Sequence, residues 1–187
     1  MKILASLLLL TAAAVALAPS PLAAQQNRAS PHETISTVVH GDRIMVVYGR
    51  PYTKDPHTGA VRKIWAGLVP YGEVWRTGAD EATLLVIEKP IVIGGTTLPS
   101  GAYTLWTLLN GDGSAKLLIN KQVGQWGIKG HNAPANYDPS RDAARVDLKL
   151  EALAAPVDQF TIAIEKEGVL KLSWEKTQFS VPFTVAK

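Results

Sequence analysis

The sequence predicts an all-β protein, an antiparallel β-sandwich or jelly roll of about ten strands with two long ordered loops. Two observations predict this fold class. Apolar residues alternate with polar ones at a period of two in most stretches after residue 30, and short turn sequences separate these stretches. The alternation over residues 146–151 is typical of a strand with one face in water. The only candidate helix is a turn or two within 62–69.

Turn residues place the predicted hairpins along the chain. Sequences rich in Gly, Asn, Asp or Glu separate apolar runs at residues 40–42, 94–95, 110–113 and 166–168. The last of them joins two alternating runs whose inward face continues to Trp174, which we therefore expect in the core. The final run ends with an alternation that contains Pro182. Since proline cannot donate to a ladder, we predict an edge strand there.

Two stretches do not read as strands, residues 50–83 and 124–145. Long irregular segments are uncommon in compact domains and often functional. Both stretches are rich in Trp, Tyr, Arg, His and Gly, so we expect them to be ordered.

The N-terminal residues predict export. Lys2 precedes an apolar run, prolines follow, and Leu22-Ala23-Ala24 offers small residues for cleavage, so residues 1–24 read as a signal peptide. A retained anchor is the alternative, but the run is shorter than the roughly 20 apolar residues that a spanning helix needs. We expect 25–32 to be a flexible leader and 33–187 a single domain. After cleavage no transmembrane segment remains, and the protein is periplasmic or secreted.

Composition excludes several classes of protein. The chain has no cysteine, which excludes a disulfide framework and a lipidated cysteine. Its net charge of +3 falls to +2 once Lys2 is removed with the signal peptide. No run of Lys and Arg could follow a phosphate backbone, so nucleic acid is not an expected partner.

Several motifs carry a resemblance to a known family. They are the segment from Tyr71 to Thr83 and the shorter sequences at 48–51, 98–105, 125–127 and 172–176. Together they resemble the domain of unknown function 2911 family over nearly the whole mature chain. The resemblance implies export and a β fold, and it carries over no catalytic residue. This chain departs from the family pattern at Asp80, where the pattern has Asn, and in the longer link at 55–61. If Asp80 lies in a site, its charge would alter what that site binds.

The segment from Trp75 to Thr83 gathers Arg76, Asp80 and Glu81. As a site, Arg76 would bind an anionic group while Glu81 or Asp80 serves as general base. As a structural clasp, Arg76 would hold the loop through a carboxylate, and we favour this interpretation with Glu81 as the partner.

Other candidates lie outside that segment. Arg50 at a strand end is read as a charge separate from Arg76 rather than as half of an anion site. In the second irregular stretch, Trp126 and Tyr137 could stack on sugar rings, but we favour buried pegs. The four histidines show no paired metal-ligand spacing, so no metal is expected, and His131 with Asp138 is the one weak alternative that remains. The sequence contains neither a G-x-S-x-G motif nor a glycine-rich phosphate loop before a helix, and we expect no cofactor.

These features favour a module of the cell envelope that binds a ligand or a partner protein. The expected binding surface comprises Arg50, Trp75, Arg76, Glu81, Trp126 and His131. One alternative is a metal-independent hydrolase acting on a glycan or ester, with Glu81 or Asp80 as base and Arg76 as electrostatic stabiliser. A structural envelope protein without a small-molecule site is the other. The sequence does not indicate an oligomeric state.

Overall fold

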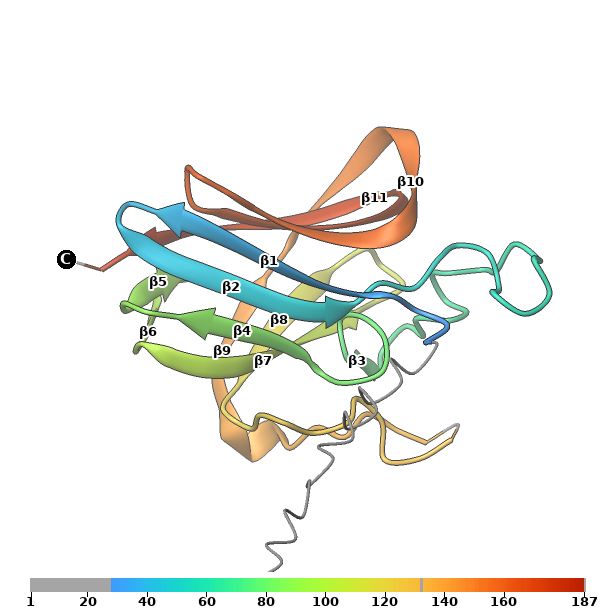
Figure 1. Ribbon diagram of the computed structural model, residues 1–187, viewed down its shortest axis with the longest axis horizontal. Coiled ribbons are helices and arrows are strands. Elements are labelled where there is room, and N and C mark those ends of the chain that lie inside the picture. Colours follow the sequence, from blue (N-terminus) through green and yellow to red (C-terminus); the bar gives the residue numbers. More distant parts are fainter. Residues whose placement is uncertain (1–27, 132, 187) are drawn as a thin grey trace, which may run out of the picture.

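The computed structural model describes residues 28–131 and 133–186, and it shows two antiparallel sheets packed together (Figure 1). The larger sheet has the order β1 (His32–Val39), β2 (Asp42–Gly49), β4 (Thr83–Ile87), β7 (Gly101–Leu109), β8 (Ala115–Asn120) and β9 (Asp142–Asp147), with β3 (Val74–Trp75) also paired to β7. The smaller sheet has the order β10 (Lys149–Glu165), β11 (Val169–Val185), β5 (Ile91–Ile93) and β6 (Thr96–Leu98). The predicted all-β sandwich is confirmed.

The predicted turns form hairpins. The turns at 40–41, 94–95, 110–114 and 166–168 join β1 to β2, β5 to β6, β7 to β8 and β10 to β11. In the first of them, His40 and Gly41 have φ angles of 46° and 80°. A two-residue turn with both central residues at positive φ matches the twist of the strands that it joins. The turn therefore sets the register that pairs β1 with β2.

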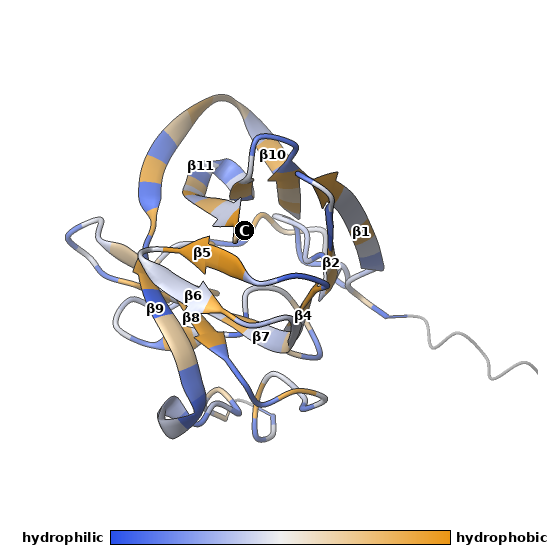
Figure 2. Ribbon diagram, turned by 90° about the vertical axis from the view of Figure 1, so that its left-hand side faces the viewer, coloured by the Kyte–Doolittle hydropathy of each residue, from blue (hydrophilic) through white to orange (hydrophobic). Residues whose placement is uncertain are grey.

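The core lies between the two sheets and has an aromatic cluster at its centre. Figure 2 shows that β5 and β8 are largely hydrophobic, whereas β9 and β10 alternate. Trp174 is fully buried, as predicted, and stacks on Trp75 with ring centroids 5.9 Å apart and planes 16° from parallel. Phe160 packs edge-on against both, at 5.0 Å from Trp75 and 5.7 Å from Trp174. Through Trp75, this cluster holds β3 against the core.

The alternation at 146–151 belongs to two strands. β9 ends at Asp147 in the larger sheet, and β10 begins at Lys149 in the smaller one. Leu148, between them, is buried, but Leu150 is 48% exposed. The chain crosses from one sheet to the other at Leu148, and the predicted single strand is corrected accordingly.

The final run is not an edge strand. In the smaller sheet β11 lies between β10 and β5. Ser180 pairs with Lys149 of β10, and Phe183 pairs with Ile93 of β5. Pro182 is exposed and falls where the strand changes partner. A proline is tolerated in this central strand because it lies between the part paired with β10 and the part paired with β5.

The candidate helix at 62–69 is a set of turns closed by backbone hydrogen bonds such as Val69 N–H to Ile64 O (2.8 Å). Instead, one 3-10 helix, η1 (Pro139–Arg141), lies between β8 and β9. Its signal was present in the sequence, because Asp138 caps it and a proline follows at the first helical position.

Within residues 28–131 and 133–186, no helix is long and apolar enough to cross a membrane. The predicted signal peptide lies outside the described residues. Of the predicted flexible leader 25–32, the structure describes residues 28–32, where Arg28 contacts Glu81 and β1 begins at His32.

Candidate functional site

The irregular segment 76–82 joins β3 to β4 and is fixed on both sides by backbone hydrogen bonds. Ala79 N–H donates to Gly49 O at the end of β2 (3.2 Å), and Gly127 N–H donates to Asp80 O (2.9 Å). Thr77 and Asp80 adopt left-handed φ angles of 54° and 65°. Non-glycine residues rarely adopt this conformation, and surrounding contacts must hold them there. The prediction that this segment has an ordered structure is confirmed.

Glycine is required where the segment touches its neighbours. A Cβ on Gly127 would lie 2.0 Å from Arg76 Cδ and 2.8 Å from Asp80 O, and one on Gly49 would lie 2.4 Å from Ala79 O. The aliphatic part of Arg76 thus rests directly on the backbone of Gly127. This close packing fixes the direction in which the guanidinium points.

A cavity of about 490 Å³, which we call the arginine cavity, opens beside this segment. Its lining includes Arg62, Leu68, Trp75, Arg76, Ile128 and Pro134. The Nε atom of Arg76 is buried and has no hydrogen-bond partner, and Arg76 forms no ion pair with any residue that the structure describes. Burial lowers the pKa of the guanidinium, although the charge of Asp80 acts in the opposite direction. The predicted clasp between Arg76 and Glu81 is wrong.

Arg62 adds a second cation to the arginine cavity. Its Nη2 donates to the backbone oxygen of Tyr52, but its Nε is buried without a partner. Glu73 is the carboxylate in the lining, and it is exposed. Trp75 forms an apolar wall backed by the aromatic cluster of the core. The cavity therefore combines apolar walls with guanidinium groups whose hydrogen-bonding capacity is incompletely used.

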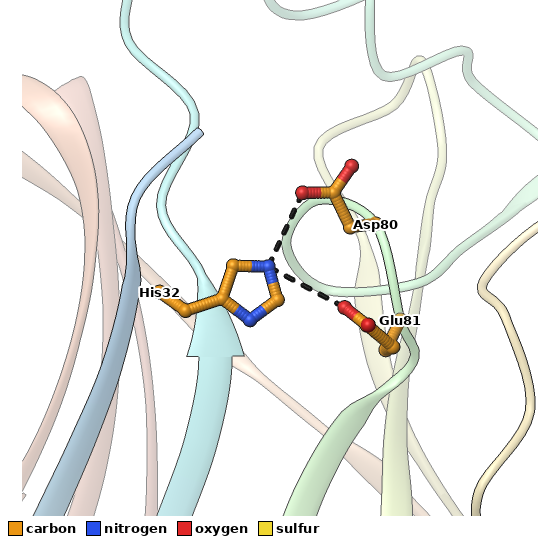
Figure 3. A group of neighbouring side chains, drawn as sticks. All are labelled: His32, Asp80 and Glu81. Atoms are coloured by element: carbon orange, nitrogen blue, oxygen red, sulfur yellow. Dashed lines mark hydrogen bonds and ion pairs between the residues drawn. The ribbon is translucent and has the colours of Figure 1, made fainter. Parts of the chain in front are cut away.

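A second cavity of about 280 Å³, which we call the carboxylate cavity, is lined by His32, Tyr48, Glu81 and Gln125 among others. Beside it, His32 Nε2 lies 3.2 Å from Asp80 Oδ2 and 3.4 Å from Glu81 Oε2 (Figure 3). One potential ligand atom from each of these three residues lies within 4.8 Å of the other two. They form the histidine–carboxylate group.

Arg28 covers the histidine–carboxylate group. Its Nη1 and Nη2 donate to the two carboxylate oxygens of Glu81 at 2.6 and 2.8 Å, and Nη1 lies 3.7 Å from Asp80 Oδ2. The guanidinium carbon also lies 5.9 Å from the centre of the Trp126 ring. Hydrogen bonds from Arg28 hold the pKa of Glu81 below its ordinary value. Glu81 is therefore held in its charged form, which makes it a weak base.

Arg50 is a structural residue. Its Nη1 lies 3.0 Å from Glu33 Oε2, its Nε donates to Phe160 O (3.1 Å), and its Nη2 donates to Thr161 Oγ1 (2.8 Å). It therefore ties the end of β2 to β1 and β10, and it lines neither cavity. Arg50 and Arg76 are separate, as predicted.

The residues singled out in the second irregular stretch, 124–145, have different roles in the structure. Tyr137 anchors the loop, as predicted, because its ring centroid lies 5.4 Å from that of the buried Trp106. Trp126 was also predicted to be buried, but it is 47% exposed. His131 is exposed and lines neither cavity. Asp138 is used to cap η1. Within the described ranges, His131 and Asp138 do not form a group with metal-ligand geometry.

His32 is one of several site residues that sequence reasoning missed, with Arg28, Arg62 and Gln125. No short spacing connects it to Asp80 or Glu81, and it was assigned to the leader. The signal that could have found it is the register of the first hairpin, which pairs His32 with Gly49. Since β4 pairs with β2 on the other side, the start of β1 and the start of β4 lie at the same end of the sheet.

Comparison with known proteins places the chain in a family. The sequence model described as "Protein of unknown function (DUF2911)" matches residues 30–183. The chain belongs to this family, as the resemblance implied. No curated protein and no solved structure matches it.

Proposed function

We propose that this member of the family is an exported protein that binds a small ligand in the arginine cavity. The observation that carries the proposal is the Arg76 guanidinium, whose buried Nε has no partner among the described residues. The terminal nitrogens of this guanidinium make no hydrogen bond to a described residue and are not enclosed, so an anionic ligand in the cavity would bind them through charge-assisted hydrogen bonds. The ligand therefore carries an anionic group.

The walls of the cavity indicate the rest of the ligand. Ligand sites are typically concave and mostly apolar, with a few polar groups that fix orientation. Here the apolar part is formed by residues such as Leu68, Trp75, Ile128 and Pro134, and the polar part by Arg62 and Arg76. A compact organic anion with an apolar or aromatic body would match both the apolar walls and the two arginines.

The geometry favours binding over the metal-independent hydrolase that the sequence left open. In that arrangement Arg76 would stabilise charge while Glu81 acted as base, but the two side chains line different cavities. Arg28 moreover lowers the pKa of Glu81. A general base works best when its pKa is close to the operating pH, and Glu81 is moved away from it.

A pair of related dyes tests the proposal. 8-Anilinonaphthalene-1-sulfonate has an aromatic body with one anionic group, and N-phenyl-1-naphthylamine has nearly the same body without charge. We expect Arg76→Met to weaken binding of the sulfonate by at least about tenfold and to leave binding of the uncharged dye nearly unchanged. Fluorescence titration gives both constants.

The matched control is Arg43→Met, which removes an exposed arginine paired with Glu88 on another part of the sheet. It should leave both dyes unaffected. Equal sulfonate affinity in wild type and Arg76→Met would refute the proposal, and so would an equal loss in Arg43→Met, which would point to net charge alone.

Export is part of the proposal and is supported by the N-terminal sequence features. Mass spectrometry of protein recovered from the periplasm or medium should find a chain that begins near Gln25. Membrane-bound protein with an intact Met1 terminus would argue against it.

A further inference from the structure

The histidine–carboxylate group has the geometry of a cation site. Its three potential ligand atoms come from the start of β1 and from the segment before β4, and they face one another (Figure 3). The separations of 3.2 and 3.4 Å between His32 Nε2 and the two carboxylate oxygens are close to those between neighbouring ligands of one ion, when each bond is about 2.0–2.2 Å long. The Asp80 and Glu81 oxygens lie within 4.8 Å of each other, so one ion would contact all three residues once these two oxygens approach to a similar separation.

The donor types indicate which ions fit. One imidazole nitrogen and two carboxylate oxygens suit first-row divalent ions such as Zn²⁺, whereas soft ions prefer thiolates. The chain has no cysteine to provide a thiolate. Two ionised carboxylates balance the charge of one divalent ion. Three protein ligands leave a coordination position open to water.

A separate observation also indicates a missing polar partner at this place. Gln125 lines the same cavity as His32 and Glu81, and its Oε1 atom is buried without a hydrogen-bond partner in the part of the chain that the structure describes. A polar side chain that lines the same cavity would belong to the outer contacts of a bound ion. Such outer contacts orient the ligands of metal sites and tune their affinity.

Arg28 currently supplies positive charge to the same carboxylates. It binds Glu81 through two hydrogen bonds and also lies near Asp80, while its own side chain remains partly exposed. Its Nη1 also lies 2.9 Å from His32 Nε2, the nitrogen that would bind the ion, and a guanidinium and a divalent cation repel each other at such distances. Arg28 is therefore positioned as a competitor of the ion.

We propose that His32, Asp80 and Glu81 bind one divalent first-row transition ion, with Zn²⁺ as the reference ion, and that Arg28 competes with it. None of the three proposed ligands lines the arginine cavity. The site would provide a cation beside the carboxylate cavity, which His32 and Glu81 line.

Titration calorimetry with zinc chloride, on mature protein freed of metal with a chelator, tests the site. We expect one ion per chain. His32→Ala and Asp80→Asn should each weaken binding by at least about tenfold, because each removes one of three ligands. His131→Ala is the matched control, since it removes an exposed histidine that lines neither cavity, and it should leave the affinity unchanged.

Arg28→Ala separates loss of the site from loss of the fold. Removing the competitor should raise zinc affinity about threefold or more, a gain that misfolding cannot produce. Thermal melts without metal verify that each variant is folded, and added zinc should raise the melting temperature of wild type but not of His32→Ala. The proposal fails if wild type and Arg28→Ala bind no zinc, or if binding survives in both ligand variants. Failure here leaves the dye experiment on Arg76 unaffected.

Discussion

The arginine cavity and the carboxylate cavity share the segment 75–82 but differ in how their charges are compensated. In the first, Arg76 is largely buried and has no anionic partner among the described residues. In the second, Glu81 is 42% exposed at its side chain and fully paired with Arg28. Burying an uncompensated charge costs stability, whereas an exposed ion pair contributes little. The difference supports the two proposals, that the arginine cavity binds an anionic ligand and that the carboxylates exchange Arg28 for a metal ion.

The largest effect should come from the aromatic support of the arginine cavity. Trp174 is fully buried and stacks on Trp75, which lines the cavity. Trp174→Ala should lower the free energy of unfolding by about 3–5 kcal/mol. Trp126→Ala, at an exposed tryptophan near the other cavity, should cost under about 0.5 kcal/mol. Urea denaturation measures both, and similar losses would contradict the assignment of Trp174 as the support.

The next largest effect concerns the close packing of Arg76 on the backbone of Gly127. A methyl group on Gly127 would meet Arg76 Cδ at 2.0 Å, so Gly127→Ala should destabilise the fold by about 1–3 kcal/mol and displace Arg76. At Gly130 the added atom would meet only Ala133 Cβ at 3.8 Å. Gly130→Ala is therefore the control, with a change under about 0.5 kcal/mol. If both variants melt alike in urea, the close packing on Arg76 is not what requires glycine.

The carboxylate cavity has an aromatic residue of its own, and its effect depends on pH. Tyr48 is buried, and desolvation raises its pKa from 10.0 to about 12. Because the folded pKa is raised, the stabilisation is fully present below pH 10 and is lost as the pH rises toward 12. At pH 11 wild type should have lost about 1 kcal/mol relative to Tyr48→Phe. Urea melts of both proteins at pH 8 and pH 11 measure this difference, and parallel behaviour would mean that Tyr48 ionises as it does in water.

The smallest effect has the opposite sign. Arg76→Met keeps the aliphatic contact with Gly127 but removes the uncompensated charge, so stability should hold or rise by up to about 1 kcal/mol. A structural clasp would instead lose about 3–5 kcal/mol when broken, because a carboxylate would be left buried. A urea melt distinguishes the two results, and a clear loss of stability in Arg76→Met would remove the contrast between the cavities.

Local sequence signals predicted most of the fold. Turns such as His40-Gly41 carry their own backbone requirement, and alternation around Trp174 identifies an inward face. The change of sheet at Leu148 was missed because a period of two continues unbroken through it. Nothing local distinguishes one strand from two that belong to different sheets.

The candidate site was predicted only in part, because local patterns do not show which distant residues meet. Segment 75–83 was identified from its composition, but the partners of its charges lie far away in sequence. Arg28 and His32 reach Glu81 only through strand pairing in the larger sheet. Charge pairing across such distances depends on register, which composition and spacing do not encode. Arg76 was accordingly assigned a partner that it does not have.

The order of strands in the smaller sheet also determines when the protein can fold. The β5–β6 hairpin lies near the middle of the chain, but β5 pairs with residues 183–185 of β11, at its end. Its apolar residues Ile91 and Ile93 are buried only in the complete sandwich. Pairings between distant segments form slowly because a long loop must close first. A nascent chain therefore cannot complete its second sheet until its last strand has been made.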